Sequence, residues 1–186
     1  MPTALTSETA PLRLDRVIEQ NAAGGWVALT IAPGKKTVGM FALWDRDLDT
    51  DLDALVSAGA TTLAPLIEDD EMRRFRIPDL VERAEAKGLY VDRFPFHDGG
   101  IPKNMDAARE FIERLADRYA KGERLVVHCA GGLGRAGAIA ACLRLHLGID
   151  PGPAEAIAAI RELRSSRAIE TRAQERFIAA YFGVGG

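Results

Sequence analysis

One short stretch of the chain brings a cysteine, an arginine and several glycines together. It follows the apolar residues 125–127 and reads His128-Cys129-Ala130-Gly131-Gly132-Leu133-Gly134-Arg135. In a turn from a strand to a helix, successive backbone N–H groups can converge on an anion, and the helix N-terminus adds its positive end. Such surroundings favour the thiolate form of Cys129, and a guanidinium such as that of Arg135 can grip two anionic oxygens. The stretch therefore predicts thiolate attack on a phosphoryl group whose oxygens are held by Arg135 and by the amides of residues 130–134.

The pattern His-Cys-x-x-Gly-x-x-Arg resembles the signature of the cysteine-dependent protein tyrosine and dual-specificity phosphatases. Further segments resemble the kinase-associated dual-specificity phosphatases in the same order, namely Pro33-Gly34-Lys35-Lys36, Phe75-Arg76-Ile77-Pro78-Asp79-Leu80, Asp98-Gly99-Gly100-Ile101-Pro102 and Ala168-Ile169-Glu170-Thr171 with Gln174. Together they span roughly residues 25–182. The resemblance implies a mostly parallel sheet with helices on both sides and a phosphorylated protein or peptide as substrate. It also implies that His128 supports the loop through hydrogen bonds.

Asp98 is the predicted general acid. It lies 31 residues before Cys129, on a segment rich in proline and glycine (residues 95–103), and it matches the position of the family's acidic aspartate. A positioned carboxylic acid contributes about 10²–10⁴ in rate. The alternative is a simple Asp-Gly turn. Asp92 is a second candidate, although it falls in a predicted strand, and His97 is predicted to be a surface residue.

Two positions depart from the family pattern. The residue after the loop arginine is usually Ser or Thr, whose hydroxyl stabilises the departing thiolate, but here it is Ala136. A lost hydrogen bond to a charged group predicts that the phosphocysteine breaks down about tenfold more slowly, or slower still. Glu170 stands where tyrosine phosphatases carry a glutamine that positions water. Gln174 either takes over that role or is a solvent-facing helical residue.

Other polar residues have two interpretations each. Cys142 is either a small core residue or the partner of Cys129 in a protective disulfide. Lys35 and Lys36 either face a phosphoprotein or belong to a solvated turn. The acidic residues 68–71 and the arginines that follow them are predicted to be surface charges. The three histidines are widely separated and no paired cysteine spacing occurs, so the sequence predicts neither a metal site nor a cofactor.

Length and composition indicate one globular domain. The chain has 186 residues, 47% of them hydrophobic, and a net charge of −3 from 24 basic and 27 acidic residues. This balance favours neither a nucleic-acid nor a membrane-surface partner. Two cysteines suit a reducing compartment, and with no evident secretory signal they indicate a cytoplasmic protein. The oligomeric state is not predicted.

Alternating strand and helix patterns favour an α/β fold with a mostly parallel central sheet flanked by helices. Strands are predicted at 26–31, 61–67, 89–94 and 125–127. Helices are predicted at 49–57, 78–87, from Asn104 to Gly122, and at 135–147, 153–164 and 171–182. Residues 1–22 are predicted to form an N-terminal arm, and residues 23–186 to form the phosphatase domain.

The main functional hypothesis is a metal-independent phosphoprotein phosphatase that acts on phosphotyrosine, and on phosphoserine and phosphothreonine if its pocket is shallow. Two alternatives remain open at this point. One is a phosphate-binding module with weak turnover, because Ala136 and Glu170 both weaken hydrolysis. The other is a phosphatase for a phosphoinositide or a small phosphoester.

Overall fold

A five-stranded sheet forms the centre of the molecule in a computed structural model that describes residues 4–38 and 42–183. Its strand order is β1-β2-β7-β5-β6. The strands are β1 (Asp15–Ile18), β2 (Trp26–Thr30), β7 (Arg124–His128), β5 (Thr62–Pro65) and β6 (Tyr90–Val91). All neighbours pair in parallel except β1, which runs antiparallel to β2. The predicted mostly parallel sheet is therefore confirmed.

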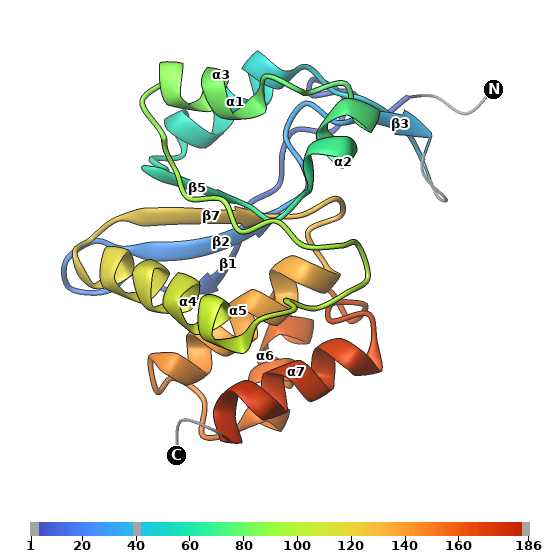
Figure 1. Ribbon diagram of the computed structural model, residues 1–186. Helices are drawn as coiled ribbons and strands as arrows, with labels where there is room; N and C mark the ends of the chain where they lie inside the picture. The colour runs from blue at the N-terminus through green and yellow to red at the C-terminus, as the bar shows by residue number, and fades with distance from the viewer. Residues whose placement is uncertain (1–3, 39–41, 184–186) are drawn as a thin grey trace.

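Helices cover both faces of this sheet, as Figure 1 shows. One face carries α1 (Leu48–Ser57), α2 (Asp69–Arg74) and α3 (Leu80–Ala86). The other carries α4 (Met105–Ala120), α5 (Gly134–His146), α6 (Pro153–Leu163) and α7 (Arg172–Gly183). The carboxyl ends of the parallel strands β2, β5 and β7 lie together at one edge, which is where α/β sheets bind their ligands.

Residues 129–135 are called the cysteine loop below. Close packing around the central helix α5 explains why so many small residues follow this loop. Nearly every side chain of α5 is buried, because α4, α6 and α7 surround it on the face away from the sheet. Alanine and glycine at these positions allow close packing on several sides at once. The start of α4 is capped by Asn104, whose side chain accepts from the N–H of Ala107, and α1 is capped in the same way by Asp47, which accepts from the N–H of Thr50.

Four elements lie outside the sequence prediction. Strand β1 falls within residues 1–22, which were expected to form an arm, and it supplies an edge of the sheet. A small two-stranded sheet is built from β3 (Lys36–Val38) and β4 (Leu43–Asp45). The short helix α2 begins with a capping box between Glu68 and Glu71. None of the helices in the described ranges combines the length and the apolar character that a membrane span requires.

Candidate active site

The cysteine loop leaves the sheet at the end of the buried strand β7 and leads directly into α5. Strand β7 lies between β2 and β5, so both neighbours fix the place where the loop begins. Gly132 has φ +65°, and a Cβ there would lie 2.2 Å from the carbonyl oxygen of Thr30. Only glycine lets the loop pass so close to the end of β2. The glycine spacing of the sequence thus has a steric cause.

Hydrogen-bond donors hold the outward carbonyl groups of the cysteine loop. Lys35 Nζ donates to the carbonyl of Ala130 at 3.1 Å. Arg164 donates through Nη2 to Gly131 at 3.2 Å and through Nε to Gly132 at 3.0 Å. The N–H of Ile169 donates to the carbonyl of Leu133 at 3.2 Å. Because a peptide group is planar and trans, the N–H groups of these peptides point to the opposite, inner side of the loop.

Arg135 lies at the start of α5 and is fully buried. Its Nη1 and Nη2 donate to the two carboxylate oxygens of Glu71, each at 2.7 Å. Nη1 also donates to the carbonyl of Phe96 at 2.8 Å. The remaining donor, Nε, has no hydrogen-bond partner among the described residues. The guanidinium is therefore clamped from one side, and it keeps one buried donor for an anion.

Glu71 is a site residue that sequence reasoning missed. The acidic run 68–71 was expected to be solvated, yet the Glu71 side chain is buried beneath Arg135. Burial opposes its ionisation, but hydrogen bonds from Arg135 and from the N–H of Glu68 hold the pKa of Glu71 below its ordinary value. Burial likewise opposes the charge of Arg135, while Glu71, Cys129 and Asp98 raise the pKa of that guanidinium. The spacing Glu68-x-x-Glu71 of a capping box was the available signal.

The structure brings Asp98 to the cysteine loop. Its Oδ1 lies 2.9 Å from Nη2 of Arg135, and its side chain remains 54% exposed. Asp92, the second candidate for the acid, instead accepts two hydrogen bonds from Arg114, one on each carboxylate oxygen, at 3.0 and 3.1 Å. His97 is 83% exposed and lies 3.5 Å from Glu68, as expected for a surface residue.

Gln174 is buried, so the interpretation as a solvent-facing residue is wrong. Its Oε1 accepts from the N–H of Glu170 at 2.8 Å, and its Nε2 donates to the carbonyl of Gly100 at 3.3 Å. Gln174 thereby links α7 to the segment that carries Asp98. A Cβ on Gly134 would collide with both Glu170 and Gln174, so both side chains lie against the start of α5.

His128 is fully buried at the end of β7. Burial lowers its pKa to about 4, and the positive charge of Arg135 acts in the same direction. The imidazole is therefore neutral at physiological pH. Its Nδ1 lies 3.4 Å from the carbonyl of Cys129, which makes this contact a weak hydrogen bond.

The two cysteines are both free thiols. Cys142 is fully buried within α5, and burial raises the pKa of its thiol. It lies near Arg109 of α4 and Tyr181 of α7. This placement fits the interpretation of Cys142 as a core residue.

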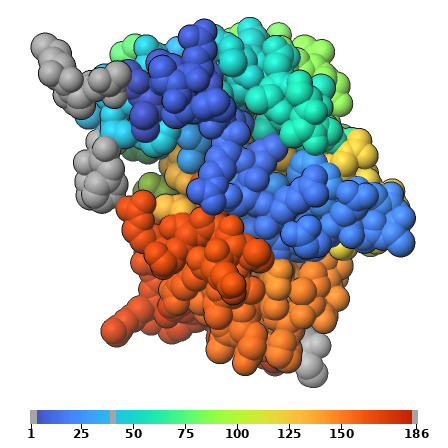
Figure 2. All heavy atoms as spheres, turned by 180° about the vertical axis from the view of Figure 1, so that it is seen from behind, coloured from blue at the N-terminus to red at the C-terminus, as the bar shows by residue number. Residues whose placement is uncertain are grey.

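A cavity of about 440 Å³ lies beside the cysteine loop. Residues that line it include Arg13, Lys35, Trp44, Leu133, Arg164 and Glu170. Figure 2 shows this face, which is hollowed between the blue N-terminal segments and the orange to red C-terminal ones. Because cations outnumber carboxylates on the wall, the approach to the loop favours anions.

Most of this chain is similar to one known protein family. The sequence model described as cyclin-dependent kinase inhibitor 3 matches residues 6–157. The proteins of that name from Rattus norvegicus and Homo sapiens are each 32% identical over 133 residues, which cover 72% of this chain and 62% of theirs. The chain therefore matches less than two thirds of the length of these relatives.

A solved structure matches almost the whole chain. It is that of a kinase-associated phosphatase in which serine replaces the catalytic-site cysteine. The TM-score is 0.83 at 26% identity, over 94% of this chain and 96% of the other. A second structure, Tk-PTP in the active form, gives a TM-score of 0.70 at 22% identity over 91% and 96% of the two chains, which supports the fold.

Proposed function

Because this chain belongs to the cyclin-dependent kinase inhibitor 3 family, we propose that it is a phosphatase that hydrolyses phosphate monoesters on proteins through a phosphocysteine intermediate, with no metal. The contact that carries the proposal is the one between Asp98 and Arg135, at 2.9 Å. It joins an exposed carboxyl group to the buried cation of the cysteine loop. The proposal therefore assigns the acid and the phosphate-binding group to two residues that are in contact, although they come from different segments of the chain.

In the first step, Cys129 Sγ attacks phosphorus and the bond from phosphorus to the ester oxygen breaks. Asp98, in its acid form, gives its proton to the departing oxygen. The loop amides and Arg135 Nε, which lacks an acceptor among the described residues, would bind the equatorial oxygens as negative charge develops there. Glu71 keeps the guanidinium in the orientation that this requires.

In the second step, the Asp98 carboxylate accepts a proton from water while the water oxygen attacks phosphorus. The bond between sulfur and phosphorus breaks, the electron pair returns to Cys129 as a thiolate, and phosphate leaves. Gln174 lies in a position to support this step, because it links the start of α7 to Gly100, two residues after Asp98. His128 and Glu170 complete the supporting set proposed from the sequence.

The test begins with an aryl phosphate in the presence of a metal chelator. The wild-type protein should hydrolyse it, and Cys129→Ser should abolish turnover. Cys142→Ser is the matched control, since this second thiol is buried in the core and should leave turnover intact. Turnover by Cys129→Ser at the wild-type rate would refute the mechanism.

The substrate class needs a panel of phosphotyrosine peptide, phosphothreonine peptide and phosphoinositide. Hydrolysis of the peptides supports a phosphoprotein phosphatase, whereas exclusive hydrolysis of the phosphoinositide refutes that class.

A second candidate function is a phosphate-binding module, which the absence of a hydroxyl at the buried residue Ala136 favours. Tight phosphopeptide binding without turnover would support the module instead.

A further inference from the structure

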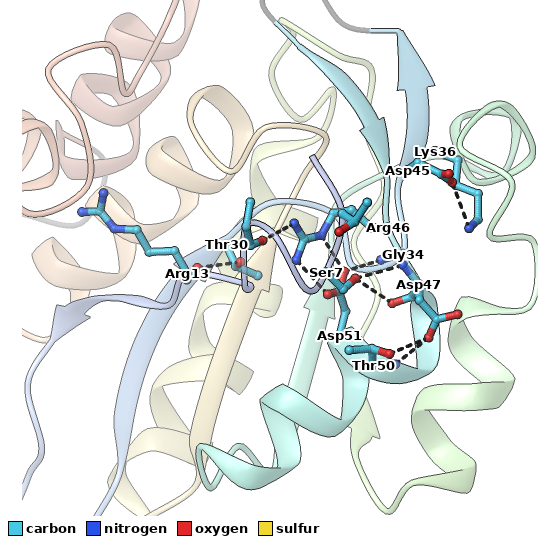
Figure 3. A network of polar contacts seen from close by, with 12 residues as sticks. Ser7, Arg13, Thr30, Gly34, Lys36, Asp45, Arg46, Asp47, Thr50 and Asp51 are labelled. Carbon is cyan, nitrogen blue, oxygen red and sulfur yellow. Dashed lines mark hydrogen bonds and ion pairs between the residues drawn. The ribbon is translucent and has the colours of Figure 1, made fainter. Parts of the chain in front are cut away.

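Lys35 is held in place by a buried ion pair that is distant from the cysteine loop in sequence. Asp51 accepts two hydrogen bonds from Arg46, at 2.7 and 2.8 Å, and both side chains are buried. The N–H of Gly34 donates to the same carboxylate at 2.8 Å, as Figure 3 shows. The N–H of Arg46 donates to the carbonyl of Lys35 at 3.2 Å. The backbone is therefore fixed at Lys35 itself and at the residue before it.

The Lys35 side chain reaches from this fixed backbone to the cysteine loop. Its Nζ lies 4.9 Å from the ring centre of Phe75 and 5.8 Å from that of Trp44, and it donates to the carbonyl of Ala130. A lysine ammonium has three donors, so this hydrogen bond leaves two others. Lys36, the next residue, points elsewhere and pairs with Asp45 at 3.3 Å.

The charge of Lys35 acts on the cysteine loop in two ways. Its hydrogen bond polarises the peptide between Ala130 and Gly131, which makes the N–H of Gly131 a stronger donor. The ammonium also interacts electrostatically with Cys129, which directly precedes Ala130 in the chain. Burial lowers the pKa of Lys35, whereas nearby Cys129 and Asp98 act to raise it. Glu71 also raises that pKa and Arg74 lowers it.

Ala136 supplies the second observation. This residue is fully buried at the start of α5 and has no side-chain donor, so it cannot give a hydrogen bond to a departing thiolate. The negative charge that forms on Cys129 when the bond from sulfur to phosphorus breaks must be stabilised by other groups. Lys35 is a cation that the fold already holds against the loop.

We propose that Lys35 is a positioning residue for the second chemical step, where its ammonium stabilises the Cys129 thiolate that leaves phosphorus and thereby takes over the work of the missing hydroxyl. This inference rests on the proposed function. Lys35 neither gives nor takes a proton in the step. Water supplies the oxygen, Asp98 takes the proton, and the electron pair of the broken bond stays on sulfur.

The experiment follows both steps by rapid quench with an aryl phosphate. Lys35→Met should slow the decay of the phosphocysteine about tenfold and change its formation less. Lys35→Arg, which keeps the charge, should restore most of the rate, and Lys36→Met should match the wild type. Introducing Ala136→Ser should reduce the effect of Lys35→Met to about threefold or less, because the hydroxyl then carries the same work.

Contrary outcomes separate this inference from the proposed function. Equal losses for Lys35→Met with alanine and with serine at position 136 would overturn the role of Lys35, as would equal losses in both chemical steps. A wild-type rate for Lys35→Met would also overturn it. The proposed function would stand in each case, provided that Cys129→Ser is inactive. Turnover that is independent of Cys129 would overturn both. The binding of tungstate by each variant, followed by thermal shift, verifies that the loop is folded.

Discussion

Replacing Glu71 with glutamine tests how Arg135 is held. Glu71→Gln keeps the shape of the side chain but removes the charge that pairs with a fully buried guanidinium. Removing one partner of a buried ion pair typically costs about 3–5 kcal/mol of folding stability. Glutamine still offers one acceptor, and Asp98 remains 2.9 Å from Nη2. We therefore expect a loss at the lower end of this range, about 3 kcal/mol in the free energy of unfolding.

The same change should impair the site. Glutamine presents one N–H₂ group to a guanidinium that is itself only a donor, so one of the two hydrogen bonds at 2.7 Å is lost. A hydrogen bond to a charged group contributes about 1.5–3 kcal/mol, which corresponds to roughly 10- to 150-fold. We expect kcat/KM to fall within this range and vanadate binding to weaken with it.

The assay combines urea unfolding at neutral pH with kcat/KM for an aryl phosphate. Asp70→Asn is the matched control, because Asp70 lies on the same helix α2 and is exposed. It should change neither quantity. If Glu71→Gln retained the stability and kcat/KM of the wild type, the claim that Glu71 clamps Arg135 would be refuted. A loss of stability without loss of vanadate binding would reduce Glu71 to a folding role.

Three further predictions concern the acid, the second step and pH. Asp98→Asn should lower kcat by about 10²–10⁴ while oxyanion binding persists, and an equal loss of vanadate affinity would argue for a binding role instead. Ala136→Ser should speed phosphocysteine decay by less than the roughly tenfold effect of an uncompensated hydrogen bond, because Lys35 already stabilises the leaving thiolate, and unchanged accumulation of the intermediate in rapid quench would reject the expectation that the missing hydroxyl slows this step. Since burial depresses the pKa of His128 from 6.5 to about 4, the unfolded state binds a proton that the folded state does not. The free energy of unfolding should therefore fall by up to about 3 kcal/mol as the pH is lowered from 6.5 to about 4. Urea unfolding of His128→Gln should show a shallower decline over the same pH range.

The sequence alone determined the local features of this protein. Periodic apolar residues and caps such as Asn104 predicted most helices and strands within a few residues, because these signals act between near neighbours. The cysteine loop was readable for the same reason, since one continuous stretch supplies the nucleophile, the glycines and Arg135. Asp98 was found through its place in a family pattern, and the structure sets it beside Arg135.

Contacts between distant segments were decided by the tertiary structure alone. Glu71 lies 64 positions from Arg135 and Lys35 lies 95 positions from Ala130, and no local pattern indicates either pair. The acidic run around Glu71 was predicted to be surface charge, and Lys35 and Lys36 were left open between a surface that faces a phosphoprotein and a solvated turn, because burial is not visible in a charge pattern. The burial of Gln174 could not be predicted for the same reason, since its partner Gly100 lies on a distant segment of the chain. Only the packing of α2 and of the segment after β2 against the cysteine loop turns these side chains into parts of one site.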